Sequence, residues 1–288
     1  MPHPDPAATD PIRVYVGAVH THRLMFEVLR WSIRRHTRRT VDVFNIGELL
    51  GPTPPLPSKP ENRPVTPFSF HRFAVPMLAG WQGRAIYLDS DQLVLRDIAE
   101  LHDLPMRFGV RLLRRAEHGR DGRTSIHASS VMLLRCDRLR AWSPQRIADD
   151  LDSGRYSYPA LMKLKPVWLK GSFSAQWNAL DHFEPQRTGL LHYTRRSAQP
   201  WLARNHPFET PWFEALYSGL DAGEVSAEAV EFAVANQYVR PSFAWQVERR
   251  LTTSDSVPED LRAADAAFLA HCSQRQFNNL DGNYRPPT

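Results

Sequence analysis

Two aspartates, Asp89 and Asp91, follow directly on a short apolar run, and this placement constrains the chain more than any other feature. Residues 85–88 form that run and predict a buried strand, so both carboxylates would lie where the strand ends in a loop. Two neighbouring carboxylates repel each other unless a cation neutralises them. The sequence therefore predicts a divalent-cation site at the end of a central strand. The alternative to a cation site is that both aspartates lie in an ordinary solvent-exposed turn.

The segment before this pair predicts a β-α-β unit. Residues 12–16 are apolar and end at Gly17, which is typical of a buried strand. Apolar residues then recur at helical spacing through Arg35, and residues 41–44 predict a second strand. A strand, helix and strand in this order build a parallel sheet. We therefore expect an α/β protein.

The rest of the chain carries weaker signals. We expect a long loop over residues 51–67, where prolines are frequent, and a helix that Ser69 caps. Ser143 followed by Pro144 predicts the start of a helix that runs to about residue 151. The other predicted elements are a helical turn at 97–101, strands at 108–110 and 130–134, and one C-terminal helix at 227–237.

Composition limits the class of protein. The 288 residues are 42% hydrophobic, enough for one large domain. The net charge of +5 comes from arginines spread along the chain, so we expect a solvated basic surface and no nucleic-acid partner. The N-terminal residues resemble no signal sequence, and no apolar run reaches membrane-spanning length. We expect a cytoplasmic protein, compatible with peripheral association at the inner membrane.

His192 is the third candidate metal ligand. It ends another short apolar segment, and a strand there could run beside the strand that carries Asp89 and Asp91. Two carboxylates and one imidazole suit Mn²⁺ or Mg²⁺, with open positions for ligand oxygens such as those of a diphosphate. Taken alone, a histidine in this position is more often a structural residue than a metal ligand.

Three runs in this order resemble glycosyltransferase family 8, the glycogenin and lipopolysaccharide galactosyltransferase group, in its bacterial form. An R-F-x-x-P motif begins at Arg72, a Y-L-D-x-D motif at Tyr87 and a D-I-x-E-L motif at Asp97. Further matches are an N-S-G-V-M-L-like segment at residues 129–134, a W-N pair at Trp177 and Asn178, and an H-Y-x-G-x-x-K-P-W-like segment at 192–201, one residue longer here.

The resemblance implies the GT-A fold, a Rossmann-like, mostly parallel sheet flanked by helices. It also implies a retaining, metal-dependent hexosyltransferase that uses a nucleotide-sugar donor, most often UDP-linked, with Mn²⁺ or Mg²⁺. We expect a disordered tail at residues 1–11, a catalytic domain at 12–205, and a helical or irregular extension at 206–288 packed on the same domain. No motif in the sequence identifies the acceptor, which could be a glycan, a lipid-linked molecule or a protein.

By position in the resemblance, Asp89, Asp91 and His192 would hold the metal, with Asp89 also near the ribose or sugar. Arg72 would approach the donor sugar or its phosphate. The residues expected against the nucleotide or diphosphate are Val16, Gly17, Ala18, Ser90, Arg195, Gln199 and Trp201.

The chain departs from the family pattern in several places. Gln199 replaces a lysine, so Arg195 or Arg196 would have to supply that cation, and Ser130 stands at a glycine position. The family's D-Q-x-x-N element, whose amide or carboxylate lies beneath the anomeric carbon, has no counterpart in residues 158–162. Two nearby polar residues, Gln176 and Asp181, are left as candidates for that role, and each could also be an ordinary surface-loop residue.

Two rival functions follow from the same residues. A nucleotidyltransferase would also set carboxylates near a nucleotide, but it would carry a glycine-rich phosphate loop after the first strand, where only Gly17 stands. A non-catalytic protein that binds a nucleotide-sugar or glycan would keep the fold without turnover, and the missing amide is consistent with it.

Overall fold

The computed structural model describes residues 10–51, 55–63, 68–117, 124–164 and 170–274. A six-stranded sheet forms the centre of this part of the chain, in the order β2-β1-β3-β6-β5-β7. All its strands except β6 run in one direction. The strands are β1 (Ile12–Gly17), β2 (Val41–Asn45), β3 (Arg84–Asp89), β5 (Val110–Glu117), β6 (Thr124–Arg135) and β7 (Lys170–Phe173).

A second, three-stranded sheet lies at the end of β3. Its order is β4-β9-β8, with β4 (Gln92–Val94) directly after the aspartate pair. β9 (Leu190–His192) runs antiparallel to β4 and parallel to β8 (Ala179–Leu180). The register pairs Gln92 with His192. The short sheet therefore brings the predicted histidine next to the predicted carboxylates.

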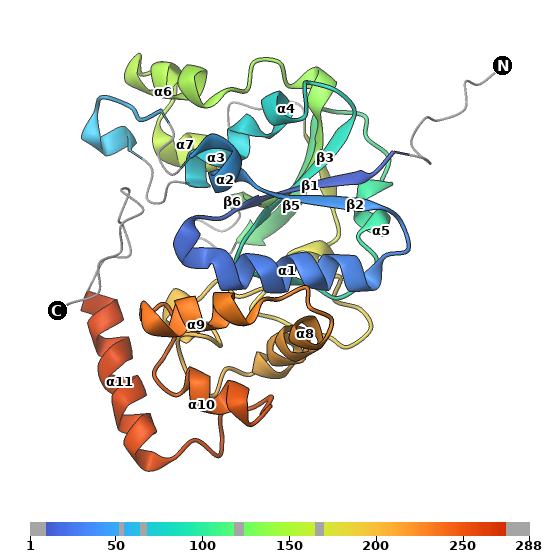
Figure 1. Cartoon of the computed structure of the whole chain (residues 1–288). Coiled ribbons are helices and arrows are strands. Elements are labelled where there is room, and N and C mark those ends of the chain that lie inside the picture. The colour runs from blue at the N-terminus through green and yellow to red at the C-terminus, as the bar shows by residue number, and fades with distance from the viewer. Residues whose placement is uncertain (1–9, 52–54, 64–67, 118–123, 165–169, 275–288) are drawn as a thin grey trace.

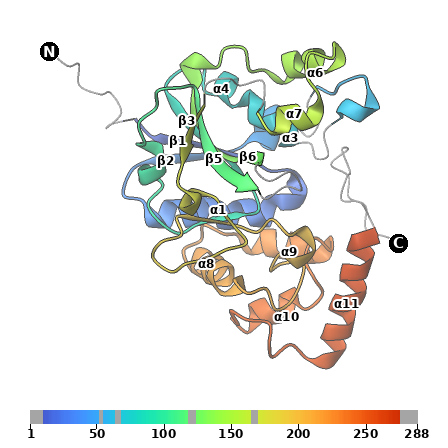
Figure 2. The ribbon, with the colours of Figure 1, turned by 180° about the vertical axis from the view of Figure 1, so that it is seen from behind.

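Helix α1 (Arg23–His36) separates two hydrophobic cores. Phe26, Leu29 and Ile33 face the core of the six-stranded sheet, at the i, i+3 and i+7 spacing of one helix face. Its other apolar face, which includes Met25 and Val28, packs on the C-terminal helices. Figure 1 shows α1 between the sheet and helices α8 and α9, and Figure 2 shows the same layering from behind.

The remaining helices divide between the two cores. Helices α2 (Ile46–Leu50), α3 (Phe68–His71), α4 (Val75–Leu78), α5 (Ala99–His102), α6 (Pro144–Asp152) and α7 (Tyr158–Met162) belong to the sheet half. The C-terminal half contains α8 (Glu209–Asp221), α9 (Ala227–Ala235), α10 (Phe243–Glu248) and α11 (Glu259–Gln274). Single 3-10 turns occur at His20–His22, Pro60–Asn62, Arg72–Ala74, Cys136–Arg138, Ala175–Trp177 and Arg196–Ala198.

Most predicted elements are confirmed. The first β-α-β unit, the strand before Asp89 and the helix after Ser143 are present, and the Ser143 side chain accepts a hydrogen bond from the amide of Arg146. The GT-A type of fold, a mostly parallel sheet flanked by helices, is confirmed as well. The predicted tail lies almost wholly outside the described residues, as do residues 52–54 and 64–67 of the predicted loop.

Two predictions are wrong. Ser69 does not cap a helix, because α3 already begins at Phe68 and Ser69 lies inside it. The predicted single helix is also divided into α3, a 3-10 turn and α4, since Pro76 has no amide hydrogen for a continuous helix. In the C-terminal third we predicted only the helix that became α9, and missed α8, α10 and α11.

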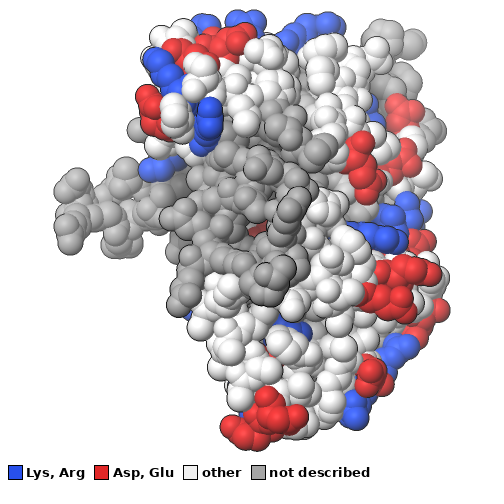
Figure 3. Space-filling model, turned by 60° about the vertical axis from the view of Figure 1, so that its left-hand side comes forward, with Lys and Arg blue, Asp and Glu red and all other residues white. Residues whose placement is uncertain are grey.

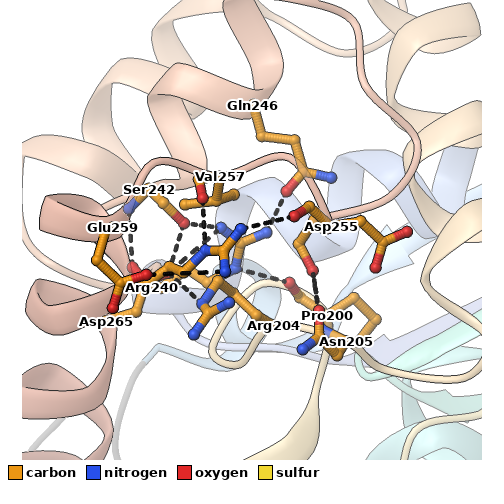
Figure 4. Close-up of polar contacts among 12 residues, drawn as sticks. Pro200, Arg204, Asn205, Arg240, Ser242, Gln246, Asp255, Val257, Glu259 and Asp265 are labelled. Atoms are coloured by element: carbon orange, nitrogen blue, oxygen red, sulfur yellow. Dashed lines mark hydrogen bonds and ion pairs between the residues drawn. The ribbon is translucent and has the colours of Figure 1, made fainter.

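A buried polar network ties α10 and α11 to the segment after Trp201 (Figure 4). The Arg240 side chain is completely buried and donates to the Ser242 hydroxyl and the Gln246 amide oxygen. Asp265 of α11 accepts from the amide of Ser242 at 2.9 Å and pairs with Arg204 at 3.2 Å. A buried arginine needs such partners to offset the loss of hydration. The network therefore fixes the C-terminal helices on the rest of the protein.

Acidic and basic side chains alternate on the face shown in Figure 3, mostly near its edges, as expected of a solvated surface. Among the described residues, no helix combines the length and apolarity needed to cross a bilayer.

The contact between α1 and α8 predicts the effect of one substitution. A Cβ atom at Gly219 would lie 2.5 Å from Cγ2 of Val225 and 3.0 Å from Cδ1 of Trp31. We expect Gly219→Ala to lower the free energy of unfolding by about 1–3 kcal/mol, because overpacking outweighs the better helix propensity of alanine. Urea unfolding of the wild type and the variant measures this difference in the free energy of unfolding. Glu214→Ala, at an exposed site on α8, is the control and should change stability by less than about 0.5 kcal/mol. Equal stability of both variants would contradict the packing.

Candidate functional site

Three polar side chains meet where β3 and β9 end. One carboxylate oxygen each from Asp89 and Asp91 and one ring nitrogen of His192 all lie within 4.8 Å of one another. The pairing of β4 with β9 causes this, because β4 begins directly after Asp91 and its first residue, Gln92, pairs with His192. The structure thus brings together the three residues predicted as metal ligands.

Asp89 is held through one of its two oxygens. Oδ1 accepts a hydrogen bond of 2.5 Å from the Tyr87 hydroxyl and pairs with Nη2 of Arg72 at 3.3 Å. The Arg72 guanidinium also donates to the Ser129 hydroxyl at 2.6 Å and lies 5.1 Å from the centre of the Tyr87 ring. Burial raises the pKa of Asp89, and the charge of Arg72 offsets only part of that effect. Both contacts use Oδ1, so Oδ2 is the oxygen available to a ligand.

Asp91 and His192 lie in direct contact. Nε2 of His192 lies 3.1 Å from Oδ1 of Asp91, and Nε2 of Gln199 donates to Oδ2 at 3.2 Å. Burial acts to raise the pKa of Asp91, but the interaction with the neighbouring His192 outweighs it and the pKa is lowered. Burial acts to lower the pKa of His192, but the two aspartates outweigh it and the pKa is raised. The protonation of each of these three groups therefore depends on the other two.

This donor set fits a divalent cation. Oδ1 of Asp91 is buried and accepts no well-directed hydrogen bond from the described part of the chain, so it is a polar atom in need of a partner. Two carboxylates and an imidazole are suitable ligands for Mn²⁺ and, with less preference, for Mg²⁺. Asp89, Asp91 and His192 are the residues that would hold the ion.

The residues predicted against the nucleotide lie beside this cluster. Gly17 pairs with Asp89 in the β1–β3 register, which places the end of β1 next to the carboxylates. The side chains of Val16 and Ala18 are fully buried, so only backbone groups could face a ligand there. The Ser90 hydroxyl shares a hydrogen bond of 3.0 Å with Nδ1 of His22. Sequence reasoning missed His22, and its place just before α1 carried no signal for this contact.

The other predicted site residues make their contacts outside the cluster of Asp89, Asp91 and His192. Arg195 is exposed, with Nε 4.0 Å from a carboxylate oxygen of Asp181; the Arg196 side chain lies outside the described part. Gln176 is directed to Arg96, with 3.5 Å between Oε1 and Nη1. The Trp201 ring is buried in the second core, against Tyr193 and Trp212.

Helix α7 occupies the side of the site next to Arg72. The Ser129 hydroxyl, which accepts from Arg72, donates to the carbonyl oxygen of Met162 at 3.1 Å. The α7 sequence, Tyr-Pro-Ala-Leu-Met, contains no carboxylate or amide side chain. The element that the sequence comparison set against the D-Q-x-x-N segment of the resembled family is therefore close to Arg72, but it has no side chain with that chemistry.

The comparisons with known proteins establish the fold. No family model matches the chain. Protein CDI of Arabidopsis thaliana is 32% identical over 104 residues, which are 33% of this chain and 37% of that protein. The structure of the WbbM bifunctional glycosyltransferase matches with a TM-score of 0.54 at 13% identity, over 77% of this chain and 52% of that one. The glycosyltransferase GlyE of Streptococcus pneumoniae TIGR4 matches with a TM-score of 0.50 at 15% identity, over 75% and 64%.

At these identities the likeness is one of fold, and the fold is that of the GT-A glycosyltransferases. The chain spans less than two-thirds of the length of each of these three proteins.

His71, directly before Arg72, predicts how stability changes with pH. Its ring is fully buried, neither ring nitrogen has a hydrogen-bond partner among the described residues, and burial lowers its pKa to about 4. Folded His71 thus stays neutral down to about pH 4, whereas the unfolded chain takes up its proton below about pH 6.5. Stability should fall as the pH drops through this window, by up to about 1.4 kcal/mol per pH unit from this residue.

Urea unfolding at several pH values tests this. His71→Leu should remove much of the slope between pH 6.5 and 4. The exposed His20 provides the control, because His20→Asn should leave the slope as it is in the wild type. An unchanged slope in His71→Leu would contradict a neutral, buried His71.

Proposed function

We propose that this protein is a metal-dependent, retaining glycosyltransferase that transfers a sugar from a UDP-linked nucleotide-sugar donor to a glycan, lipid-linked or protein acceptor. The cluster of Asp89, Asp91 and His192 at the carboxyl end of β3 carries the proposal. On a GT-A sheet, this is the edge where ligands bind outside the ends of parallel strands. Similarity to the WbbM and GlyE glycosyltransferases supports the same class of reaction.

The chemistry of glycosyl transfer from such a donor requires a stabilised leaving group. When bound, a divalent cation offsets the negative charge that develops on the departing nucleoside diphosphate. Asp89 and Asp91 would hold the ion, each with one oxygen already fixed by protein contacts. Because these contacts orient the carboxylates before a donor arrives, little rearrangement would be needed.

Cationic side chains of the protein would assist at the same place. Arg72 is buried beside Asp89, where its charge lies near the donor sugar or phosphate if the ion sits between the carboxylates. Arg195 is exposed at the rim and carries a charge that Asp181, at 4.0 Å, meets only loosely. Arg195 is therefore our candidate for the cation that the resembled family supplies with a lysine at the position of Gln199.

The family resemblance also supports retention of configuration. In that case the acceptor hydroxyl attacks the anomeric carbon from the face that the diphosphate leaves. We keep Gln176 and Asp181 as the polar candidates near the sugar; in the structure Gln176 bonds to Arg96 and Asp181 accepts from the amide of Thr194 at 3.0 Å. A donor would have to draw Gln176 away from Arg96 for it to act there.

A donor panel tests the proposal. Purified protein is incubated with Mn²⁺ and a set of UDP- and GDP-sugars, and release of the nucleoside diphosphate is followed. We expect Asp91→Asn to reduce release at least about 100-fold, because even loss of a residue that only supports a metal ligand costs 10–100-fold. Asp42→Asn, an exposed position on β2, should behave as the wild type. Equal release by the Asp91 and Asp42 variants would contradict the assignment.

One observation favours a second candidate, a non-catalytic protein that binds a nucleotide-sugar or glycan. Helix α7 lies next to Arg72 and lacks the carboxylate and amide of the family element. Calorimetry with UDP and Mn²⁺, set beside the release assay, separates the two functions. Binding without hydrolysis or transfer for any donor would favour the binding protein.

A further inference from the structure

Asn178 lies behind His192 and bonds to the ring nitrogen that faces away from Asp91. It is 1% exposed, between the 3-10 turn Ala175–Trp177 and β8. Its Oδ1 lies 3.0 Å from Nδ1 of His192, and its Nδ2 donates to the Ser130 hydroxyl at 3.0 Å. An amide oxygen can only accept a hydrogen bond, so in this arrangement Nδ1 of His192 carries a proton.

Ser130 and Gln92 fix the position of this amide. Nε2 of Gln92 donates to the backbone carbonyl of Ser130 at 3.1 Å, and Gln92 lies opposite His192 in the β4–β9 pair. Gln92 is also 1% exposed. Residues from β4 and β6 therefore hold Asn178 against His192 through a series of partly buried polar contacts. Ser130 stands where the resembled family segment has glycine, so its hydroxyl is an addition of this sequence.

The orientation of Asn178 decides which nitrogen of His192 has a free lone pair. If the amide were reversed, its NH₂ group would donate to Nδ1, and the neutral ring would carry its proton on Nε2. Nε2 is the nitrogen 3.1 Å from Asp91 and thus the one that belongs to the cluster. A proton held there would compete with any cation.

We propose that Asn178, anchored by Ser130, is a positioning residue that keeps a proton on Nδ1 of His192 and thereby reserves Nε2 for a divalent cation. This inference rests on the proposed function of the Asp89, Asp91 and His192 cluster. Outer hydrogen bonds of this kind fix the tautomer and ring orientation of metal-binding histidines.

Two substitutions at position 178 distinguish the effect of the hydrogen-bond acceptor from the effect of side-chain volume. Asn178→Asp keeps an oxygen acceptor for Nδ1, whereas Asn178→Leu has a similar volume and no acceptor. Mn²⁺ affinity, measured by electron paramagnetic resonance of the free ion, should be retained in Asn178→Asp and reduced about 10–100-fold in Asn178→Leu. Asn178→Leu with wild-type affinity would overturn the inference.

A second readout does not need the metal. In nitrogen-15 NMR of the metal-free protein, Nδ1 of His192 should be protonated in the wild type and in Asn178→Asp, with a slowly exchanging proton. An unprotonated Nδ1 in the wild type means that the amide is reversed, and this would overturn the inference.

Ser130→Ala provides a milder variant should Asn178→Leu not fold. It leaves Asn178 in place but removes the acceptor for Nδ2, so Mn²⁺ affinity should fall by less than in Asn178→Leu, on the order of a few-fold. Wild-type affinity in Ser130→Ala would contradict the anchoring role.

The same measurements distinguish this inference from the proposed function. A wild-type protein that binds no Mn²⁺, with or without UDP, contradicts the proposed function. Mn²⁺ binding that Asn178→Leu leaves intact contradicts only the role of Asn178.

Discussion

The close approach of two carboxylates at the end of β3 is the constraint on which the site depends. Asp89 and Asp91 are largely removed from water, so each needs a positive or hydrogen-bonding partner to remain charged. Arg72 and Tyr87 serve Asp89, and His192 with Gln199 serves Asp91. These partners each fix one side of a carboxylate, and a cation bound by both carboxylates would complete the charge balance.

The fold assembles these partners from distant parts of the chain. Arg72 follows α3, His192 ends β9, and Gln199 precedes a segment held by the buried Arg240 network. Helix α1 packs on both cores and donates no ligand, yet the Ser32 hydroxyl accepts from the amide of Val94 and fixes β4 beneath the site. The C-terminal helices therefore support the same cluster that the sheet presents.

Sequence reasoning found the parts of the site that lie in regular elements or motifs. The strand before Asp89 and the short apolar segment before His192 were visible from their composition, and the structure brings their ends together. The roles of Asn178 and Ser130 depend on a contact across 48 residues, which no local pattern encodes. Helices α8, α10 and α11 were missed because buried polar residues, namely Glu209, Gln246 and Asp265, interrupt the apolar periodicity on which helix prediction relies.

The location of a bound cation is the most direct test of whether Asp89, Asp91 and His192 form a metal site. Crystals of the protein grown with Mn²⁺ and UDP, measured at a wavelength where manganese scatters anomalously, would show the ion by its own signal. We expect one manganese peak in contact with Asp89, Asp91 and Nε2 of His192. A peak elsewhere, or none at these residues while UDP is bound, would contradict it.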